Sequence, residues 1–176
     1  AICMHEEDYG IQWKHYDSES QTSEVRRSRR LVISSIFTIG NYDYGFYWYL
    51  YLDGTIQMEI KLTGIVGVSA VTEATHNPAQ SPLIAEGLAS PVHQHVFCFR
   101  LDWELDGGPN AIYESQIEVL PISDTNPDGT QFQSVSTHLV DEASAKRNVY
   151  PERSRHWKVV NPASLNLSLI HISEPT

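Results

Sequence analysis

The dominant pattern of hydrophobic and polar positions along the chain is that of β-strands: runs rich in branched and aromatic residues end at turn residues such as Gly, Asn and Asp. Branched and aromatic residues fill the stretch from Leu31 to Ile39, which ends at Gly40 and Asn41. Aromatic residues then crowd residues 44–52 on both faces of the expected strand, so we expect that strand to be central in a sheet. Helical periodicity is hard to find. The pattern predicts an all-β protein.

Asp53 and Gly54 separate two of these β-like stretches, Tyr44 to Leu52 and Thr55 to Thr63. Asp-Gly readily adopts the positive φ angles of a two-residue turn, so the sequence predicts a β-hairpin here. Further along, residues 72–90 are rich in Pro, Asn, Ser and Ala, which is typical of a long loop.

The segment from His93 to Leu105 shows the clearest alternation, and its apolar members indicate a strand with one buried face. Weaker strands are expected at residues 111–120 and 131–140. Together these stretches predict a large antiparallel β-sandwich, or part of one. The residues that share the expected buried face are His93, His95, Phe97, Phe99, Leu101, Trp103 and Leu105.

Composition and charge disfavour some classes of binding partner. The chain has 176 residues, 12 Lys plus Arg against 22 Asp plus Glu, and a net charge of −10. This charge disfavours nucleic acids and anionic membranes as partners, and no apolar run reaches the ~18 residues of a membrane span. The one basic cluster, Arg26 to Arg30, is expected to form ion pairs where a strand begins.

The two cysteines do not indicate a disulfide framework, and Cys98 is expected to be a buried free thiol. The cellular compartment therefore stays open.

His93 and His95 form a His-x-His pair. On a strand, residues two apart point to the same face, so both imidazoles can reach one metal ion such as copper, zinc, iron or nickel. A third ligand must then come from elsewhere. A cupin would need a Glu a few residues after the second histidine, but the first Glu after His95 is Glu104. The alternative is a non-catalytic β-sandwich, a binding or structural module in which the His-x-His pair is incidental.

The run Asn41-Tyr42-Asp43-Tyr44 is by composition a polar, aromatic junction between strands. It also resembles the Asn-Tyr-(Asp/Glu)-Tyr signature around the self-processed tyrosine of the copper amine oxidases, also called primary amine oxidases. The 51 positions between Tyr42 and His93 fit that family. Other segments that resemble it, in the same order, are residues 5–8, 13–15, 26–30, 38–48, 63–64, 93–95, 100–102 and 157–162.

The resemblance implies that Tyr42 is the precursor of topaquinone and that His93 and His95 bind copper. It implies that Asn41 holds the cofactor ring and that Gly40 leaves room for the substrate. The implied reaction oxidises a small primary amine with dioxygen and yields an aldehyde, ammonia and hydrogen peroxide. A calcium-like ion at Asp102 and the carbonyl of Trp103 is also implied.

The same resemblance implies that the chain is incomplete at both ends and inactive alone. The family's catalytic aspartate would precede residue 1, and its third copper histidine would follow Asn166. We expect His138 and His156 to be surface residues, and a full-length parent would be a homodimer. Residues 1–166 are expected to be a partial catalytic domain. Residues 167–176 resemble a translated sequencing-adapter tail, so His171 is not considered a ligand.

Overall fold

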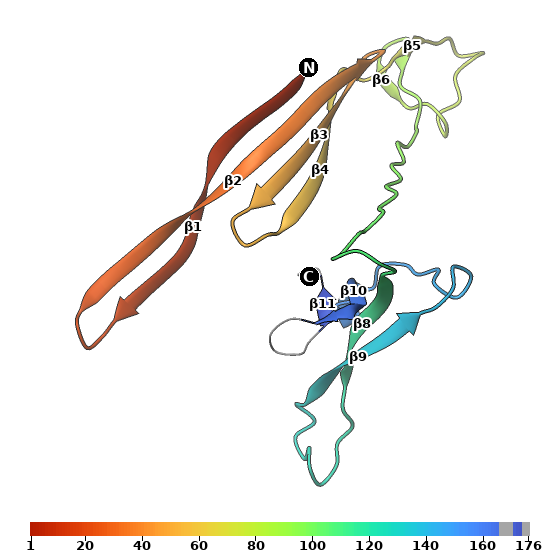
Figure 1. The fold of residues 1–176 in the computed structure, drawn as a ribbon. Coiled ribbons are helices and arrows are strands. Elements are labelled where there is room, and N and C mark those ends of the chain that lie inside the picture. The colour runs from red at the N-terminus through yellow and green to blue at the C-terminus, as the bar shows by residue number, and fades with distance from the viewer. Residues whose placement is uncertain (166–170, 174–176) are drawn as a thin grey trace. The chain divides into compact units, whose positions relative to one another are not determined.

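The computed structural model describes residues 1–165 and 171–173, and these residues form mainly β-strands (Figure 1). All strand pairings are antiparallel, which confirms the predicted fold class. The chain divides into two compact units, residues 1–98 and residues 99–176. Within the described ranges, no helix is long and apolar enough to cross a membrane.

The first unit contains a four-stranded sheet in the order β1-β2-β3-β4. β1 and β2 are long and run past the ends of the two shorter strands, as Figure 1 shows. β2 pairs with β3 only between Arg30 and Ile39, so the strand predicted at 31–39 is the part of β2 inside the full sheet. The strands are β1 Ile2–Asp17, β2 Thr22–Ile39, β3 Tyr42–Tyr51 and β4 Ile56–Gly64.

The predicted hairpin between β3 and β4 is confirmed, but its turn differs from the expected one. The amide of Tyr51 donates to the carbonyl of Thr55 (2.9 Å), so the loop has three residues rather than two. Only Gly54 has a positive φ, +88°. This is the geometry of a tight turn followed by a left-handed glycine. Asp53 instead accepts a hydrogen bond from the Thr55 amide (2.9 Å).

A second tight hairpin joins β2 to β3. Ile39 pairs with Tyr42, so Gly40 and Asn41 alone form the loop. Gly40 has φ +61°, and a positive φ at the first of two loop residues is the pattern of a type II′ turn, which favours glycine. This turn makes Tyr42 the first residue of β3.

The register of β2, β3 and β4 gives this sheet two chemically different faces. The first, here called the apolar face, includes Tyr42 and Tyr44 together with aliphatic and aromatic residues. The second, here called the charged face, carries the polar partners of the same strands. The apolar face comprises Leu31, Ile33, Ser35, Phe37, Ile39, Tyr42, Tyr44, Phe46, Trp48, Leu50, Ile56, Met58, Ile60, Leu62 and Gly64; the charged face includes Arg30, Tyr47, Tyr49, Tyr51, Glu59 and Lys61.

The basic cluster forms ion pairs, as predicted, and three of its arginines join β2 to β1. The cluster lies inside β2, which begins at Thr22, and not at the start of the strand as expected. Arg27 pairs with Asp8, Arg29 with Glu6 and Arg30 with Glu7. The hydrogen bond from Arg27 lowers the pKa of Asp8 to about 2. These three pairs join residues about 20 positions apart in sequence, so they help to set the strand register.

The loop predicted at residues 72–90 contains more structure than expected. Three short strands form a small sheet in the order β5-β7-β6. Two of them lie within the predicted loop. The strands are β5 Ser69–Ala70, β6 Leu83–Ala85 and β7 Leu88–Ala89.

The second unit contains a sheet in the order β11-β10-β8-β9. Asn161 of β10 is 2% exposed, and its amide group donates to the carbonyls of Leu105 (2.8 Å) and Gly107 (2.7 Å). This buried amide fixes the loop that precedes β8. The elements are β8 Ala111–Val119, β9 Phe132–Leu139, the 3₁₀ helix η1 Pro151–Arg153, β10 His156–Leu165 and β11 His171–Ser173; β8 and β9 confirm the two weaker predicted strands.

The strand predicted at residues 93–105 is wrong. Within the described part of the chain, residues 93–104 make no backbone hydrogen bonds, and a strand needs a hydrogen-bonded neighbour. The expected burial also fails, because Phe99 and Leu101 are exposed. Cys98, expected to be buried, is exposed as well. Most of the predicted tail, residues 167–170 and 174–176, lies outside the described residues.

Candidate metal and cofactor site

Tyr42 lies at the start of β3 and is half-buried. Its hydroxyl accepts a hydrogen bond from the amide of Gly67 (3.1 Å). Gly64 has φ +103°, and a Cβ there would lie 2.4 Å from the Asn41 carbonyl oxygen. A Cβ at Gly67 would lie 3.2 Å from the Tyr42 hydroxyl. Two glycines therefore let the chain after β4 pass close to Tyr42.

The structure brings the rings of His93 and His95 beside Tyr42. Their centroids lie 5.6 Å and 5.3 Å from the Tyr42 ring and 4.9 Å from each other. Both imidazoles therefore point to the same side, as the two-residue spacing predicts for an extended chain. The segment keeps this alternation although it is not a paired strand.

Both histidines use Nδ1 for hydrogen bonding. Nδ1 of His93 lies 2.8 Å from the carbonyl oxygen of Pro91. Because a carbonyl only accepts, this contact places the proton on Nδ1 and leaves the lone pair on Nε2. Nδ1 of His95 lies 2.9 Å from the hydroxyl of Tyr44. Neither Nε2 makes a hydrogen bond within the described residues.

This arrangement fits a metal that imidazoles bind. A metal-bound imidazole usually binds through one nitrogen while the other is held by a hydrogen bond, and copper accepts such ligands. His93 and His95 supply two nitrogens from one side. Within residues 1–165 and 171–173, no three His, Cys, Asp or Glu side chains gather closely enough to hold an ion. A metal held by both histidines would therefore need a third ligand from outside these residues.

Tyr44 and Phe97 belong to the same cluster, although the sequence pattern did not indicate a role for them in it. The Tyr44 ring lies 5.5 Å from His95 and 6.2 Å from Phe97, and Phe97 also lies 6.2 Å from Phe46. The spacing of Tyr42 and Tyr44 could have indicated the position of Tyr44. Tyr44 follows Tyr42 by two residues, so both side chains project from the same face of β3.

The residues next to Tyr42 in sequence, Gly40, Asn41 and Asp43, make few contacts with its side chain. A Cβ at Gly40 would meet nothing within 4 Å, so the loop is open there. Asn41 is exposed, and its side chain makes no hydrogen bond within the described residues, although its carbonyl accepts from Ile65 (2.7 Å). Asp43 accepts a hydrogen bond from the Thr38 hydroxyl (2.5 Å) across the β2–β3 pair rather than from backbone.

The remaining candidates lie in the second unit. Asp102 and Trp103 are both exposed, and Asp102 has no hydrogen-bond or ion-pair partner in the described part of the chain. His138 and His156 are exposed, as predicted. Nothing in these surroundings resembles a formed metal site.

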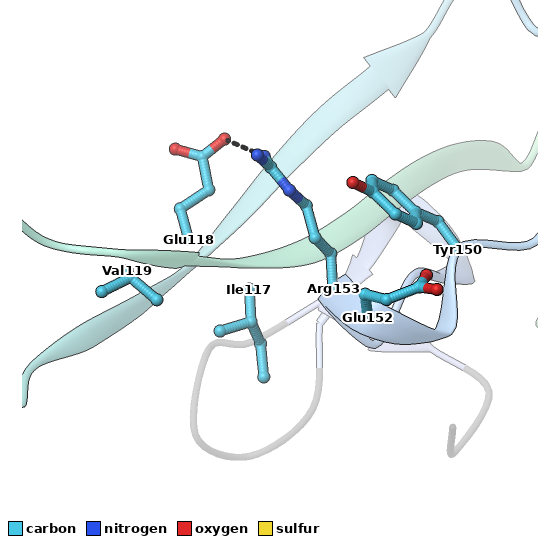
Figure 2. Close-up of a pocket in the computed structure, with 6 residues that line it drawn as sticks. All are labelled: Ile117, Glu118, Val119, Tyr150, Glu152 and Arg153. Carbon is cyan, nitrogen blue, oxygen red and sulfur yellow. Dashed lines mark ion pairs between the residues drawn. The ribbon is translucent and has the colours of Figure 1, made fainter.

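A pocket of about 450 Å³ lies beside β8. Figure 2 shows Glu118 and Arg153 reaching toward one another across it, with Tyr150 at one side; the ion pair spans 3.7 Å. Two of its three charged side chains, Glu118 and Arg153, pair with each other, and its lining contains no histidine or cysteine. The histidine cluster is therefore the stronger candidate.

Comparison with known proteins adds independent information. The chain matches the family described as copper amine oxidase, enzyme domain, over residues 1–172. It is 48% identical over 175 residues to histamine oxidase of Arthrobacter globiformis, covering 99% of this chain and 25% of that protein. It is 38% identical over 170 residues to a peroxisomal copper-containing diamine oxidase of Nicotiana tabacum, covering 94% and 22%.

The fold of the chain is also similar to that of a solved structure. The chain is similar to the crystal structure of a copper-containing benzylamine oxidase from Hansenula polymorpha, with a TM-score of 0.81 at 23% identity, over 98% of this chain and 27% of that one. The chain thus spans about a quarter of the length of the relatives it matches. Because the family match covers nearly all residues, the chain belongs to the copper amine oxidase family, within its enzyme domain.

Proposed function

We propose that this chain supplies the cofactor-forming part of an enzyme that oxidatively deaminates primary amines. The observation that carries the proposal is the position of the Tyr42 ring beside two imidazoles, with centroids 5.6 Å and 5.3 Å away. The whole enzyme, called the parent enzyme below, would convert a primary amine, dioxygen and water into an aldehyde, ammonia and hydrogen peroxide.

The roles within the site follow from its contacts. Nε2 of His93 and of His95 would hold copper, with the third ligand supplied from outside the described residues. Tyr42 would be the precursor of topaquinone, and the copper and quinone together would supply an electron sink for the amine and a route to dioxygen. The Gly67 amide restrains the Tyr42 hydroxyl, and the open loop at Gly40 leaves space at the start of β3.

The alternative of a non-catalytic module is less well supported. An incidental His-x-His pair would not be expected to pack against Tyr42, which is 51 positions from His93 and whose hydroxyl is held by a backbone amide. The names of the relatives, histamine oxidase and diamine oxidase, support amines as the substrate class. A homodimeric parent and a calcium-like ion at Asp102 and Trp103 stay as proposals that need residues outside this chain.

The decisive experiment uses the parent enzyme prepared without copper. Addition of copper in air should produce a visible quinone band that reacts with phenylhydrazine. Tyr42→Phe should bind copper but stay colourless and inactive, because phenylalanine has no phenol to oxidise. Tyr47→Phe, on the charged face of the same strand, is the matched control and should keep its colour. A Tyr42→Phe enzyme that still oxidised amines would rule out this mechanism.

A further inference from the structure

We propose that Tyr44 is a positioning residue for the metal centre, because its hydroxyl holds Nδ1 of His95 and thereby presents Nε2 of that ring to the metal. The inference rests on the proposed function, since it takes His95 to be a copper ligand. It adds a residue and a physical role that the proposed function does not require.

The geometry gives Tyr44 two contacts with His95. The Tyr44 hydroxyl lies 2.9 Å from Nδ1, which is hydrogen-bond distance, and the two rings meet edge to face with centroids 5.5 Å apart. One contact fixes the rotation of the imidazole about its side-chain bonds, and the other fixes its position. Both come from β3, an interior strand of its sheet.

The hydrogen bond also bears on the tautomer of His95. A neutral imidazole that binds metal through Nε2 must carry its proton on Nδ1. That proton then needs an acceptor, and the Tyr44 hydroxyl oxygen is at the right distance. Such partners of metal-bound histidines fix both tautomer and ring orientation.

The two histidines depend on different supports. His93 is anchored by the carbonyl of Pro91, two residues away in its own segment. His95 is anchored by a side chain of the sheet, 51 positions away. Because residues 93–98 make no backbone hydrogen bonds in the described part of the chain, side-chain contacts hold His93, His95 and Phe97 against the sheet. Tyr44 is the residue that joins His95 to β3 by a hydrogen bond.

The test compares copper binding by the metal-free parent enzyme and its variants. Copper affinity is measured by competition with a chelator, and electron spin echo modulation reports the hydrogen bonding of the remote imidazole nitrogens. Tyr44→Phe should lower the affinity about 10- to 100-fold and change the signal of one remote nitrogen. Tyr47→Phe should leave both readouts unchanged. Phe97→Leu removes an aromatic neighbour of Tyr44 but keeps the hydroxyl, so its nitrogen signals should match the wild type.

The outcomes separate the two proposals. If His95→Ala loses copper but Tyr44→Phe keeps wild-type affinity and nitrogen signals, the role of Tyr44 is wrong and the proposed function stands. If His95→Ala binds copper as tightly as the wild type, both fail. Should Tyr44→Phe not fold, a copper-loaded structure of the wild-type enzyme decides. Copper on Nε2 with Tyr44 on Nδ1 supports the role, and copper on Nδ1 of His95 overturns it.

Discussion

The two faces of the β2–β3–β4 sheet are built from the same strands but differ in how their side chains are partnered and buried. On the charged face, Arg30 lies between the rings of Tyr9 and Tyr49, at 4.1 Å and 3.8 Å from their centroids. Tyr49 is 2% exposed and donates a hydrogen bond to Glu59 (2.6 Å). On the apolar face, large side chains such as Ile39 and Leu62 stay exposed, at 65% and 54%.

This difference suggests that the charged face stabilises the sheet, whereas the apolar face near Tyr42 carries the candidate metal site. The charged face satisfies its own polar groups through ion pairs, cation–π contacts and hydrogen bonds within the sheet. Within the described residues the apolar face has no ion pairs or cation–π contacts of this kind. The extended segment with His93, His95 and Phe97 covers the end of this face near Tyr42. We therefore expect changes on the charged face to alter folding, and changes around Tyr42 to alter metal chemistry.

The largest effect is expected from His93→Ala in the parent enzyme. Loss of one imidazole should abolish copper uptake and quinone formation, and activity should fall to background, because the third ligand and His95 alone form a poor site. Circular dichroism should show an unchanged fold. His138→Ala, an exposed histidine on β9, is the control and should behave as wild type. Normal copper content in His93→Ala would break the division between the two faces.

Tyr49→Ala should have the largest effect on stability. Removal of a buried aromatic side chain costs about 3–5 kcal/mol, and the Glu59 carboxylate also loses its donor. Urea unfolding of the parent enzyme should show this loss, while the copper affinity of the folded enzyme should not change. A loss below about 1 kcal/mol would mean that the charged face does not carry the stability of the sheet.

Arg30→Met should have an intermediate effect. Methionine keeps much of the side-chain length but loses the cation between Tyr9 and Tyr49 and the guanidinium partner of Glu7. We expect a loss of about 1–3 kcal/mol in the free energy of unfolding. Arg26→Met is the matched control, because Arg26 is exposed and pairs with Glu24 of its own strand, so its loss should stay within about 0.5 kcal/mol. Equal losses in both variants would contradict the special role of Arg30.

The smallest effect concerns pH and the hydrogen bond between Tyr49 and Glu59. The Tyr49 hydroxyl lowers the pKa of Glu59 from 4.5, so its stabilising contribution is present above that value and is lost as pH falls through the lower folded pKa. Burial, followed by the Glu59 hydrogen bond, raises the pKa of Tyr49 from 10.0. That contribution is complete below pH 10 and is lost as pH rises through the raised pKa.

Tyr49→Phe should therefore flatten the pH profile of the melting temperature at both ends. Glu59→Gln should remove the acid limb. It should leave much of the alkaline limb, because burial is the first cause of the Tyr49 shift. A Tyr49→Phe protein with the wild-type profile in both limbs would show that this hydrogen bond does not contribute to the pH dependence.

The features that were predicted correctly from the sequence depend on turn residues and on the local pattern of side chains. The Asp53-Gly54 hairpin, the ion pairs of Arg27, Arg29 and Arg30, and the shared direction of His93 and His95 depend on near neighbours or on strand alternation. The length of the β3–β4 loop was mispredicted because Asp-Gly also suits a three-residue loop. The strand at 93–105 was mispredicted because alternation reports an extended chain and cannot report whether a neighbouring strand is present.

The sequence by itself determined the all-β class, the family resemblance and the identity of Tyr42, His93 and His95 as a group. The class and the shared direction of His93 and His95 follow from side-chain period, which is a local property, whereas the grouping of Tyr42 with them was implied by the family resemblance. Only the tertiary structure decided which atoms meet. The contact of Tyr44 with Nδ1 of His95 and of the Gly67 amide with the Tyr42 hydroxyl joins residues 51 and 25 positions apart. Such contacts depend on how loops bring segments onto a strand face, and no local pattern encodes that distance.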